Sequence, residues 1–278
     1  MNELRDSSVD QHSPESRIAP DGRGRAEPPA PIPDVLVWQA DGRPLPGRGY
    51  GDPIAARLRR LGARVRTIDY RHRALTDAER AAPVHVLSGG ATSAFADDPA
   101  TNRALAELHR ISQRAWADQA TLVGICLGAQ LLARVIAPTL DRCTPVLGME
   151  AGWQRVAGPQ GALHVAELHY EEIHPGFASL GGVTITHSND HSPVQAFRWG
   201  PATIGMQFHP EWSPLDVRSV LGRHRHLLAR RHRDPDAALA SIPDGVSRGR
   251  YDTFDELVAR PVARRLRAVR TRRAVPAA

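Results

Sequence analysis

The stretch that most constrains the fold is Thr121–Gln130, with the sequence TLVGICLGAQ. Its first half is apolar and predicts a buried strand, and a helix is expected to begin at about Leu127. Cys126 lies at the turn between them, with Gly124 and Gly128 two residues away on either side. This G-x-nucleophile-x-G spacing is typical of a nucleophile elbow, with cysteine in place of serine.

The glycine spacing around Cys126 has a physical reason. A residue at the tip of a tight strand-to-helix turn has a strained backbone, and side chains two residues away would collide with the turn unless those residues are glycines. The helix that follows points its positive end at the sulfur and favours the reactive thiolate. The alternative interpretation is a small buried core cysteine, which is common after an apolar strand.

The first half of the sequence alternates predicted strands and helices. They are expected at residues 34–38 (strand), 52–61 (helix), 63–68 (strand), 84–87 (strand), 99–119 (helix) and 121–125 (strand). This alternation predicts an α/β fold with a doubly wound, mostly parallel sheet flanked by helices. Ligands of such sheets bind beyond the carboxyl ends of the strands, where both Gly89-Gly90 and Cys126 are expected.

The second half predicts short strands punctuated by glycine and proline, at 153–156, 163–170, 183–186, 194–199 and 203–208. We expect them to add antiparallel strands to the core sheet, followed by a helix over about 214–230. The predicted domain therefore covers residues 34–232, after a disordered leader at 1–33.

Residues 233–278 form an arginine-rich C-terminal extension. Its apolar residues could form one face of a helix. This extension is either a helix packed on the core or a docking arm. Pro261 is expected to kink any helix there, because proline lacks a backbone N–H.

Composition limits the compartment and the partners. Cys126 and Cys143 are the only cysteines, so no disulfide framework is implied and a reduced cytoplasmic setting fits. We find no signal-peptide pattern and no stretch that is long and apolar enough to span a bilayer. The formal charge is +6 and the chain has no lysine, an arginine bias that a GC-rich genome produces. We therefore expect neither a membrane nor a nucleic-acid partner.

A cysteine hydrolase needs a thiolate, an imidazole that carries its proton, a group that orients the imidazole, and donors for an oxyanion. The sequence supplies Cys126 as the thiol, His209 as the proton carrier and Glu211 as the orienting carboxylate. The expected oxyanion donors are the N–H of Leu127 and an N–H from the Gly89-Gly90 loop.

Three motifs resemble those of the class I, Cys-His-Glu glutamine amidotransferases, in that family's order. They are Leu87–Gly90 (LSGG), Gly124–Gln130 (GICLGAQ) and Gly205–Glu211 (GMQFHPE). A fourth segment, His187–Val194 (HSNDHSPV), is similar to the family's substrate loop more loosely. The resemblance spans about residues 34 to 230 and implies a flavodoxin-like fold.

The resemblance also implies an activity: L-glutamine is hydrolysed to glutamate and ammonia through a γ-glutamyl thioester. By resemblance, the residues that help to hold the substrate glutamine are Gln130, His187, Ser188 and Asn189. The family needs no cofactor for this step. It passes the ammonia to a synthetase or transferase, and because this chain leaves no room for one, a separate partner is expected.

The sequence differs from the family pattern at positions that bear on which acyl substrate is bound, and not at the nucleophile. Ala91 stands where the family commonly has proline, and the substrate loop has an inserted-looking Asn189 and an extra His191. No metal site is expected, because the residues around His187 and His191 argue against a helix that would place them on one face. No GxxxxGK[ST] or GxGxxG pattern is present, so no nucleotide site of known type is expected.

Alternative functions stay open at this point. The first interpretation is an ammonia-producing glutamine amidotransferase that serves a partner enzyme, and the second is a stand-alone γ-glutamyl hydrolase with a wider pocket. The third is a non-catalytic regulatory or nucleic-acid-binding protein that keeps the fold and uses its arginine-rich tail. The intact Cys126, His209 and Glu211 argue against the third, which a salt-dependent DNA shift would favour.

Overall fold

A seven-stranded sheet carries the candidate site residues, in the order β2-β1-β3-β4-β9-β8-β7. The strands are β1 (Val35–Gln39), β2 (Val65–Asp69), β3 (Val84–Leu87), β4 (Thr121–Ile125), β7 (Val183–His187), β8 (Ala196–Trp199) and β9 (Thr203–Met206). The strands from β2 to β9 in this order are parallel, whereas β8 and β7 continue the sheet as antiparallel strands. The predicted doubly wound, mostly parallel α/β sheet is confirmed.

The computed structural model describes residues 31–40, 47–140, 144–230, 234–244 and 252–274. Residues 1–30, which make up most of the predicted leader, lie outside the described residues, and so does Cys143.

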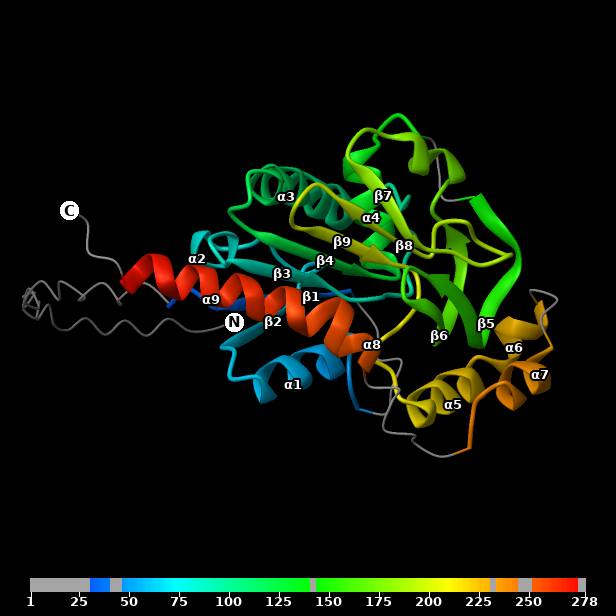
Figure 1. Ribbon diagram of the computed structural model, residues 1–278. Helices are drawn as coiled ribbons and strands as arrows, with labels where there is room; N and C mark the ends of the chain where they lie inside the picture. Colours follow the sequence, from blue (N-terminus) through cyan, green and yellow to red (C-terminus); the bar gives the residue numbers. More distant parts are fainter. Residues whose placement is uncertain (1–30, 41–46, 141–143, 231–233, 245–251, 275–278) are drawn as a thin grey trace, which may run out of the picture. The chain divides into compact units, whose positions relative to one another are not determined.

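Helices cover both faces of the sheet (Figure 1). The helices α3 (Pro99–Trp116) and α4 (Leu127–Ile136) pack on one face, and α1 (Asp52–Arg60) and α9 (Arg260–Ala274) pack on the other. The short helix α2 (Asp77–Arg80) precedes β3. Among the described residues, no helix combines the length and the apolar character that crossing a membrane requires.

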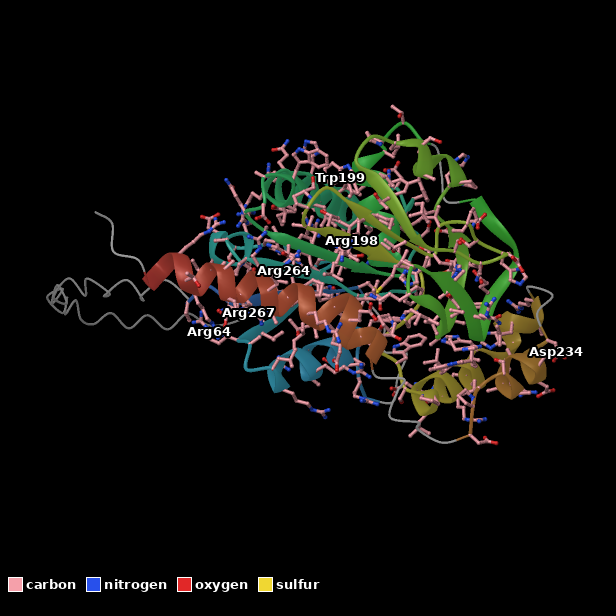
Figure 2. The ribbon with its side chains drawn as sticks, viewed as in Figure 1. Arg64, Arg198, Trp199, Asp234, Arg264 and Arg267 are labelled. Atoms are coloured by element: carbon pink, nitrogen blue, oxygen red, sulfur yellow. The ribbon has the colours of Figure 1, made fainter. Side chains whose placement is uncertain are left out.

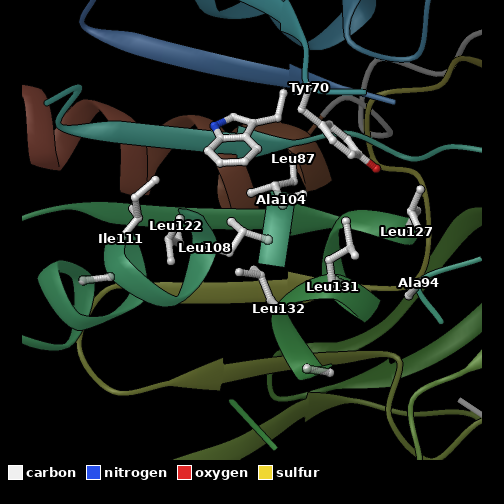
Figure 3. Packing of buried hydrophobic residues seen from close by; sticks show 14 of the residues in the cluster. Tyr70, Leu87, Ala94, Ala104, Leu108, Ile111, Leu122, Leu127, Leu131 and Leu132 are labelled. Atoms are coloured by element: carbon white, nitrogen blue, oxygen red, sulfur yellow. The ribbon is translucent and has the colours of Figure 1, made fainter. Parts of the chain in front are cut away.

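Alternation along the strands explains why both faces are apolar. Leu122 of β4 packs with Leu108 and Ile111 of α3 (Figure 3), whereas the next residue, Val123, belongs to the cluster on the opposite face. Successive side chains of a strand point to opposite faces, so a central strand covered on both sides must be apolar throughout. Every residue of β4 is buried accordingly.

The starts of two helices follow from local capping. The side chain of Asp98 accepts hydrogen bonds from the backbone N–H groups of Ala100 and Thr101 at the start of α3. Ser213 and Asp216 form a capping box at the start of α5 (Pro214–Arg223). Such caps satisfy backbone donors that have no partner within the helix. The helix predicted over 214–230 is in fact interrupted at His224, and α6 (Arg225–Arg230) follows.

A long hairpin lies outside the main sheet. Its strands β5 (Thr144–Gly158) and β6 (Gly161–Glu172) pair with each other in a separate two-stranded sheet. The strands predicted at 153–156 and 163–170 therefore do not join the core sheet. The antiparallel strands that extend that sheet are β7 and β8. A 3-10 helix (Pro175–Ser179) connects the hairpin to β7, and α5, α6 and α7 (Pro235–Ala240) pack against the hairpin.

The C-terminal segment covers the sheet face that it shares with α1. It consists of α8 (Asp252–Phe254), a π-helical turn (Asp255–Ala259) and α9. Its apolar side chains join the core cluster of that face: Phe254, Val258, Val262 and Leu266. Pro261 lies in the first turn of α9, directly after the π-helical turn. Prolines and π-helical turns are both common where the regular hydrogen bonding of a helix is interrupted. Arg264 and Arg267 are exposed on α9 (Figure 2).

One buried arginine fastens α9 to the start of β4. The guanidinium of Arg265, only 6% exposed, donates hydrogen bonds to Thr121 Oγ1 at 3.2 Å and to the carbonyl oxygens of Asp118 and Ala120 at 2.8 and 3.3 Å. It also pairs with the carboxylate of Asp118, which is largely exposed. An exposed ion pair contributes little, so most of the stabilisation comes from the buried carbonyl and hydroxyl acceptors.

We expect Arg265→Ala to lower the free energy of unfolding by about 2–3 kcal/mol, because buried acceptors would lose their donor. Urea denaturation of the purified chain measures this change. Arg264→Ala is the matched control, since its side chain is exposed on the same helix and should change stability by less than about 0.5 kcal/mol. Equal effects of the two substitutions would contradict the anchoring role of Arg265.

Candidate active site

The carboxyl ends of three neighbouring strands, β3, β4 and β9, carry the candidate residues. The Gly89-Gly90 loop follows β3, Cys126 follows β4 and His209 follows β9. These strands are parallel neighbours, and the register pairs Ile125 of β4 with Met206 of β9. Residues far apart in the sequence therefore meet at one edge of the sheet, where α/β sheets bind ligands.

Cys126 lies in a strained turn between β4 and α4. Its φ angle is 51° and its ψ angle −113°, and Asp118 is the one other non-glycine residue with positive φ among the described residues. The Cys126 N–H donates to the Met206 carbonyl oxygen at 2.7 Å, which ties the turn to β9. Strain at a single nucleophilic residue, held by neighbouring strands, is typical of a functional site.

The two glycines of the elbow are required by close backbone approach. A Cβ on Gly124 would lie 2.6 Å from the carbonyl carbon and oxygen of Gly128, and a Cβ on Gly128 would lie 2.6 Å from the carbonyl oxygen of Leu87. Because real Cβ atoms do not approach backbone atoms this closely, any side chain at either position would force the turn apart.

His209 is buried between two acidic groups. Its Nδ1 lies 2.8 Å from Glu211 Oε1, and both side chains are at most 2% exposed. The side chain of Cys126 lies close enough to the imidazole to act on its charge. The His209 N–H donates to the Ala166 carbonyl oxygen of β6 at 2.8 Å, so the hairpin fixes the backbone of this residue.

Electrostatics favour a charged His209. Burial lowers its pKa, but the negative charges of Glu211 and Cys126 and the hydrogen bonds to both outweigh burial and raise the pKa to about 10. Since the folded-state pKa lies above the ordinary value of about 6.5, this stabilisation is full below that pH and is lost as the pH rises through about 10. At neutral pH the arrangement therefore favours an imidazolium at His209.

A tryptophan supports the imidazole from one side. The rings of Trp212 and His209 are stacked, with centroids 3.7 Å apart and planes 3° apart. Trp212 is itself buried and stacks more loosely on Tyr50, at 6.5 Å. An indole face stabilises a cation placed over it, and the stack also restricts rotation of the His209 ring. Trp212 directly follows Glu211 in the sequence, but no role was predicted for it.

The Gly89-Gly90 loop lies against the same pair of side chains. A Cβ on Gly89 would lie 2.7 Å from His209 Cε1 and 3.5 Å from Cys126 Cβ. A Cβ on Gly90 would lie 2.6 Å from Leu127 Cδ2. Glycine at both positions thus lets the backbone approach the thiol closely enough to present its N–H groups.

Strand β6 borders the thiol and was not assigned to the site from the sequence. The Leu168 carbonyl oxygen lies 3.9 Å from Cys126 Sγ. Gln130, a predicted substrate residue on α4, donates from Nε2 to the Glu171 carbonyl oxygen at 2.8 Å, and Gln207 donates to the same oxygen at 3.0 Å. The backbone of β6 therefore forms one wall beside Cys126.

Of the other predicted substrate residues, Ser188 and Asn189 bind the hairpin, whereas His187 binds its neighbour in β7. His187 Nδ1 lies 3.1 Å from Thr186 Oγ1. The backbone of Ser188 pairs with Ala157 near the end of β5, and Asn189 Nδ2 donates to Glu150 Oε1 at 2.6 Å. Direct contact of these residues with glutamine stays a prediction.

A buried ionisable cluster lies on the hairpin next to this wall. Glu150, Glu167 and His169 are each at most 3% exposed, and their ligand atoms lie within 4.8 Å of one another. Two ionisable residues at alternate positions of one strand, Glu167 and His169, share a face, and this signal was available in the sequence. Of the described residues, these could hold a metal ion.

Comparison with known proteins identifies the domain type. The sequence model of the family described as "glutamine amidotransferase class-I" matches residues 47–219. No curated protein sequence matches the chain.

Solved structures share the fold at low sequence identity. A glutamine amidotransferase from Thermotoga maritima is 19% identical, with a TM-score of 0.64, over 84% of this chain and 97% of that one. A glutamine amidotransferase from Methylobacillus flagellatus is 20% identical, with a TM-score of 0.60, over 86% and 95%. One putative component of a GMP synthase, from Thermoplasma acidophilum, is 21% identical, with a TM-score of 0.50, over 69% and 96%.

We predict that Glu211→Gln lowers the pKa of His209 by about one to three pH units, because the imidazolium loses its charged partner. NMR titration of the His209 ring measures the pKa directly. The alkylation rate of Cys126 with iodoacetamide should fall at pH 7 in the same variant, since less thiolate would be paired with imidazolium. An unchanged His209 pKa would show that Glu211 does not stabilise the charge.

Trp212→Leu is expected to lower the pKa of His209 by about one pH unit, because a buried cation–π contact contributes roughly 1–2 kcal/mol. Trp212→Phe should retain part of the effect. Trp116→Leu is the control, since Trp116 is a half-exposed tryptophan of α3 whose ring packs at a tilt against Trp199. If the leucine variants at 116 and 212 titrate alike, the stacked indole has no role in holding the charge.

Proposed function

The chain belongs to the class-I glutamine amidotransferase family, and we propose that it hydrolyses L-glutamine to glutamate and ammonia through a thioester on Cys126. One observation carries the proposal: Cys126, at a strained elbow, lies beside a buried His209 whose Nδ1 is 2.8 Å from Glu211 Oε1. This arrangement supplies the nucleophile, the proton carrier and the orienting acid of a cysteine hydrolase.

In the proposed first step, the Cys126 thiolate attacks the side-chain amide carbon of glutamine. The oxyanion that forms accepts hydrogen bonds from the N–H of Leu127 and from an N–H of the Gly89-Gly90 loop. His209 then gives its proton to the amide nitrogen, the C–N bond breaks, and ammonia leaves. A γ-glutamyl thioester remains on Cys126.

In the second step, water attacks the thioester carbon. His209, now neutral, takes a proton from the water, and Glu211 stabilises the imidazolium that forms. The C–S bond breaks, glutamate leaves, and the thiolate–imidazolium pair is restored. Each step thus uses the same His209 ring, first as an acid and then as a base.

The proposed substrate wall combines Gln130 with the backbone of β6. Leu168 is included because its carbonyl oxygen lies 3.9 Å from Cys126 Sγ. Gln130 is included because it donates a hydrogen bond to Glu171 of the same strand. His187, Ser188 and Asn189 are proposed to act by holding the hairpin, because Ser188 pairs with β5 and Asn189 binds Glu150. A shifted hairpin would move the Leu168 carbonyl relative to the thiol.

We also propose that the ammonia is passed to a separate synthetase or transferase. This is supported by the family, and by the fold likeness to a chain named as a putative component of GMP synthase. A partner could control the reaction, because one of the two proposed oxyanion donors lies on the Gly89-Gly90 loop, which the partner could align.

Cys126→Ala is expected to abolish release of glutamate from glutamine, because the nucleophile is lost, while far-UV circular dichroism stays unchanged. Cys143→Ala, which removes the other cysteine, is the matched control and should keep the activity. Glutamate release that persists in Cys126→Ala would remove the thiol from the mechanism.

The same Cys126→Ala variant tests the partner. In a complex with the acceptor enzyme, product formation should fail with glutamine and return with added ammonium salt, because only the nitrogen source is lost. A γ-glutamyl amide panel on the isolated chain separates the alternatives. Full activity that no partner raises would favour a stand-alone γ-glutamyl hydrolase, and no activity on any amide would favour a non-catalytic protein.

A further inference from the structure

The hairpin holds a cluster of ionisable side chains that the proposed reaction does not use. Glu150 comes from β5, and Glu167 and His169 come from β6. His169 Nε2 lies 3.0 Å from Glu150 Oε2 and 3.1 Å from Glu167 Oε2. The three residues are 1%, 0% and 3% exposed, so water does not screen these charges.

The hydrogen bonds around His169 fix which nitrogen faces the carboxylates. His169 Nδ1 lies 3.1 Å from the Glu171 carbonyl oxygen, which can only accept, so Nδ1 carries a proton. Nε2 is then the nitrogen that points toward Glu150 and Glu167. An imidazole that donates one N–H to a backbone carbonyl, with the other nitrogen free, is the arrangement typical of a metal-ligating histidine.

The contacts at Nε2 have ion-pair distances but lack the geometry of directed hydrogen bonds. Nε2 and both oxygens of Glu167 are buried and lack a hydrogen-bond partner of acceptable geometry among the described residues. Glu150 differs, because Asn189 Nδ2 donates to its Oε1 at 2.6 Å and Gln195 Nε2 donates to its Oε2 at 2.9 Å. Those amides orient Glu150 as outer partners orient a ligating carboxylate. Buried polar atoms left without a partner are costly unless something else occupies the site.

We propose that Glu150, Glu167 and His169 bind one divalent transition-metal ion, with Zn²⁺ as the first choice. Two carboxylates and a neutral imidazole would balance the charge of a divalent cation. Tetrahedral ligand bonds of about 2.0–2.1 Å place neighbouring ligand atoms about 3.3–3.4 Å apart, a few tenths of an ångström more than the 3.0 and 3.1 Å separations at Nε2. Glu150, Glu167 and His169 would supply three ligands, and a water would take the fourth position.

The site would act through the residue between two of its ligands. Leu168 lies between Glu167 and His169, and its carbonyl oxygen is 3.9 Å from Cys126 Sγ. A bound ion would join β5 to β6 and fix the strand that borders the thiol. This role is structural, and it does not depend on the proposed glutamine hydrolysis.

The metal content of the full-length chain tests the proposal. Expressed with zinc in the medium and measured by plasma mass spectrometry, the wild type should hold about one zinc per chain. Glu167→Gln and His169→Ala should lose it. His164→Ala is the matched control, because His164 is exposed on the same strand, and Cys126→Ala should keep the ion because the thiol is not a ligand.

A second measurement serves if a ligand variant fails to fold. The Cys126→Ala chain, unfolded and refolded with Co²⁺, should show visible d–d absorption, and X-ray absorption should show one nitrogen and otherwise oxygen ligands. A folded wild type that retains no zinc, even after refolding with excess Zn²⁺, would overturn the proposal and assign His169 as an imidazolium between two carboxylates. Zinc retained equally by wild type, Glu167→Gln and His169→Ala would also overturn it.

Discussion

The strained backbone of Cys126 is the constraint on which the rest of the site depends. A positive φ at a cysteine persists only where its surroundings hold it. Here the Cys126 N–H is bound to β9, and Gly124 and Gly128 let the backbone close around the turn. The start of the same strand is held by Arg265 of α9. The core sheet and a helix from the far end of the sequence thus stabilise one unfavourable dihedral angle.

Burial decides the chemistry that this turn can support. His209 is removed from water, which alone would keep the imidazole neutral. The charges of Glu211 and Cys126 lie close enough to reverse that preference, and Trp212 adds a π face to the imidazolium. Because each of these groups is nearly inaccessible to solvent, their interactions are weakly screened. His209 would therefore be charged before any ligand binds.

Local motifs could be predicted from the sequence, whereas contacts set by the hairpin could not. Short sequence motifs identify the elbow around Cys126 and the positions of His209 and Glu211. The alternation of strands and helices predicts which strand ends lie at the same edge of the sheet. The Leu168 contact is different, because it uses a backbone carbonyl that leaves no mark on residue type. It also depends on the hairpin crossing beside the site instead of joining the sheet edge, which strand propensity does not determine.

The hydrophobic core includes residues beyond the part of the chain that the family model matches. The match ends at residue 219, yet Phe254, Val258 and Val262 lie beyond it and pack into the same cluster as Val37 and Val123. A central parallel strand must be covered on both faces, and α1 covers only part of the face opposite α3 and α4 (Figure 1). Without α9, the apolar face of β3 and β4 would be exposed directly behind the elbow. The arginine-rich composition of α9 is thus compatible with a core role. Arg264 and Arg267 are exposed, Arg265 is buried against the start of β4, and the apolar residues of the helix cover the sheet that positions Cys126.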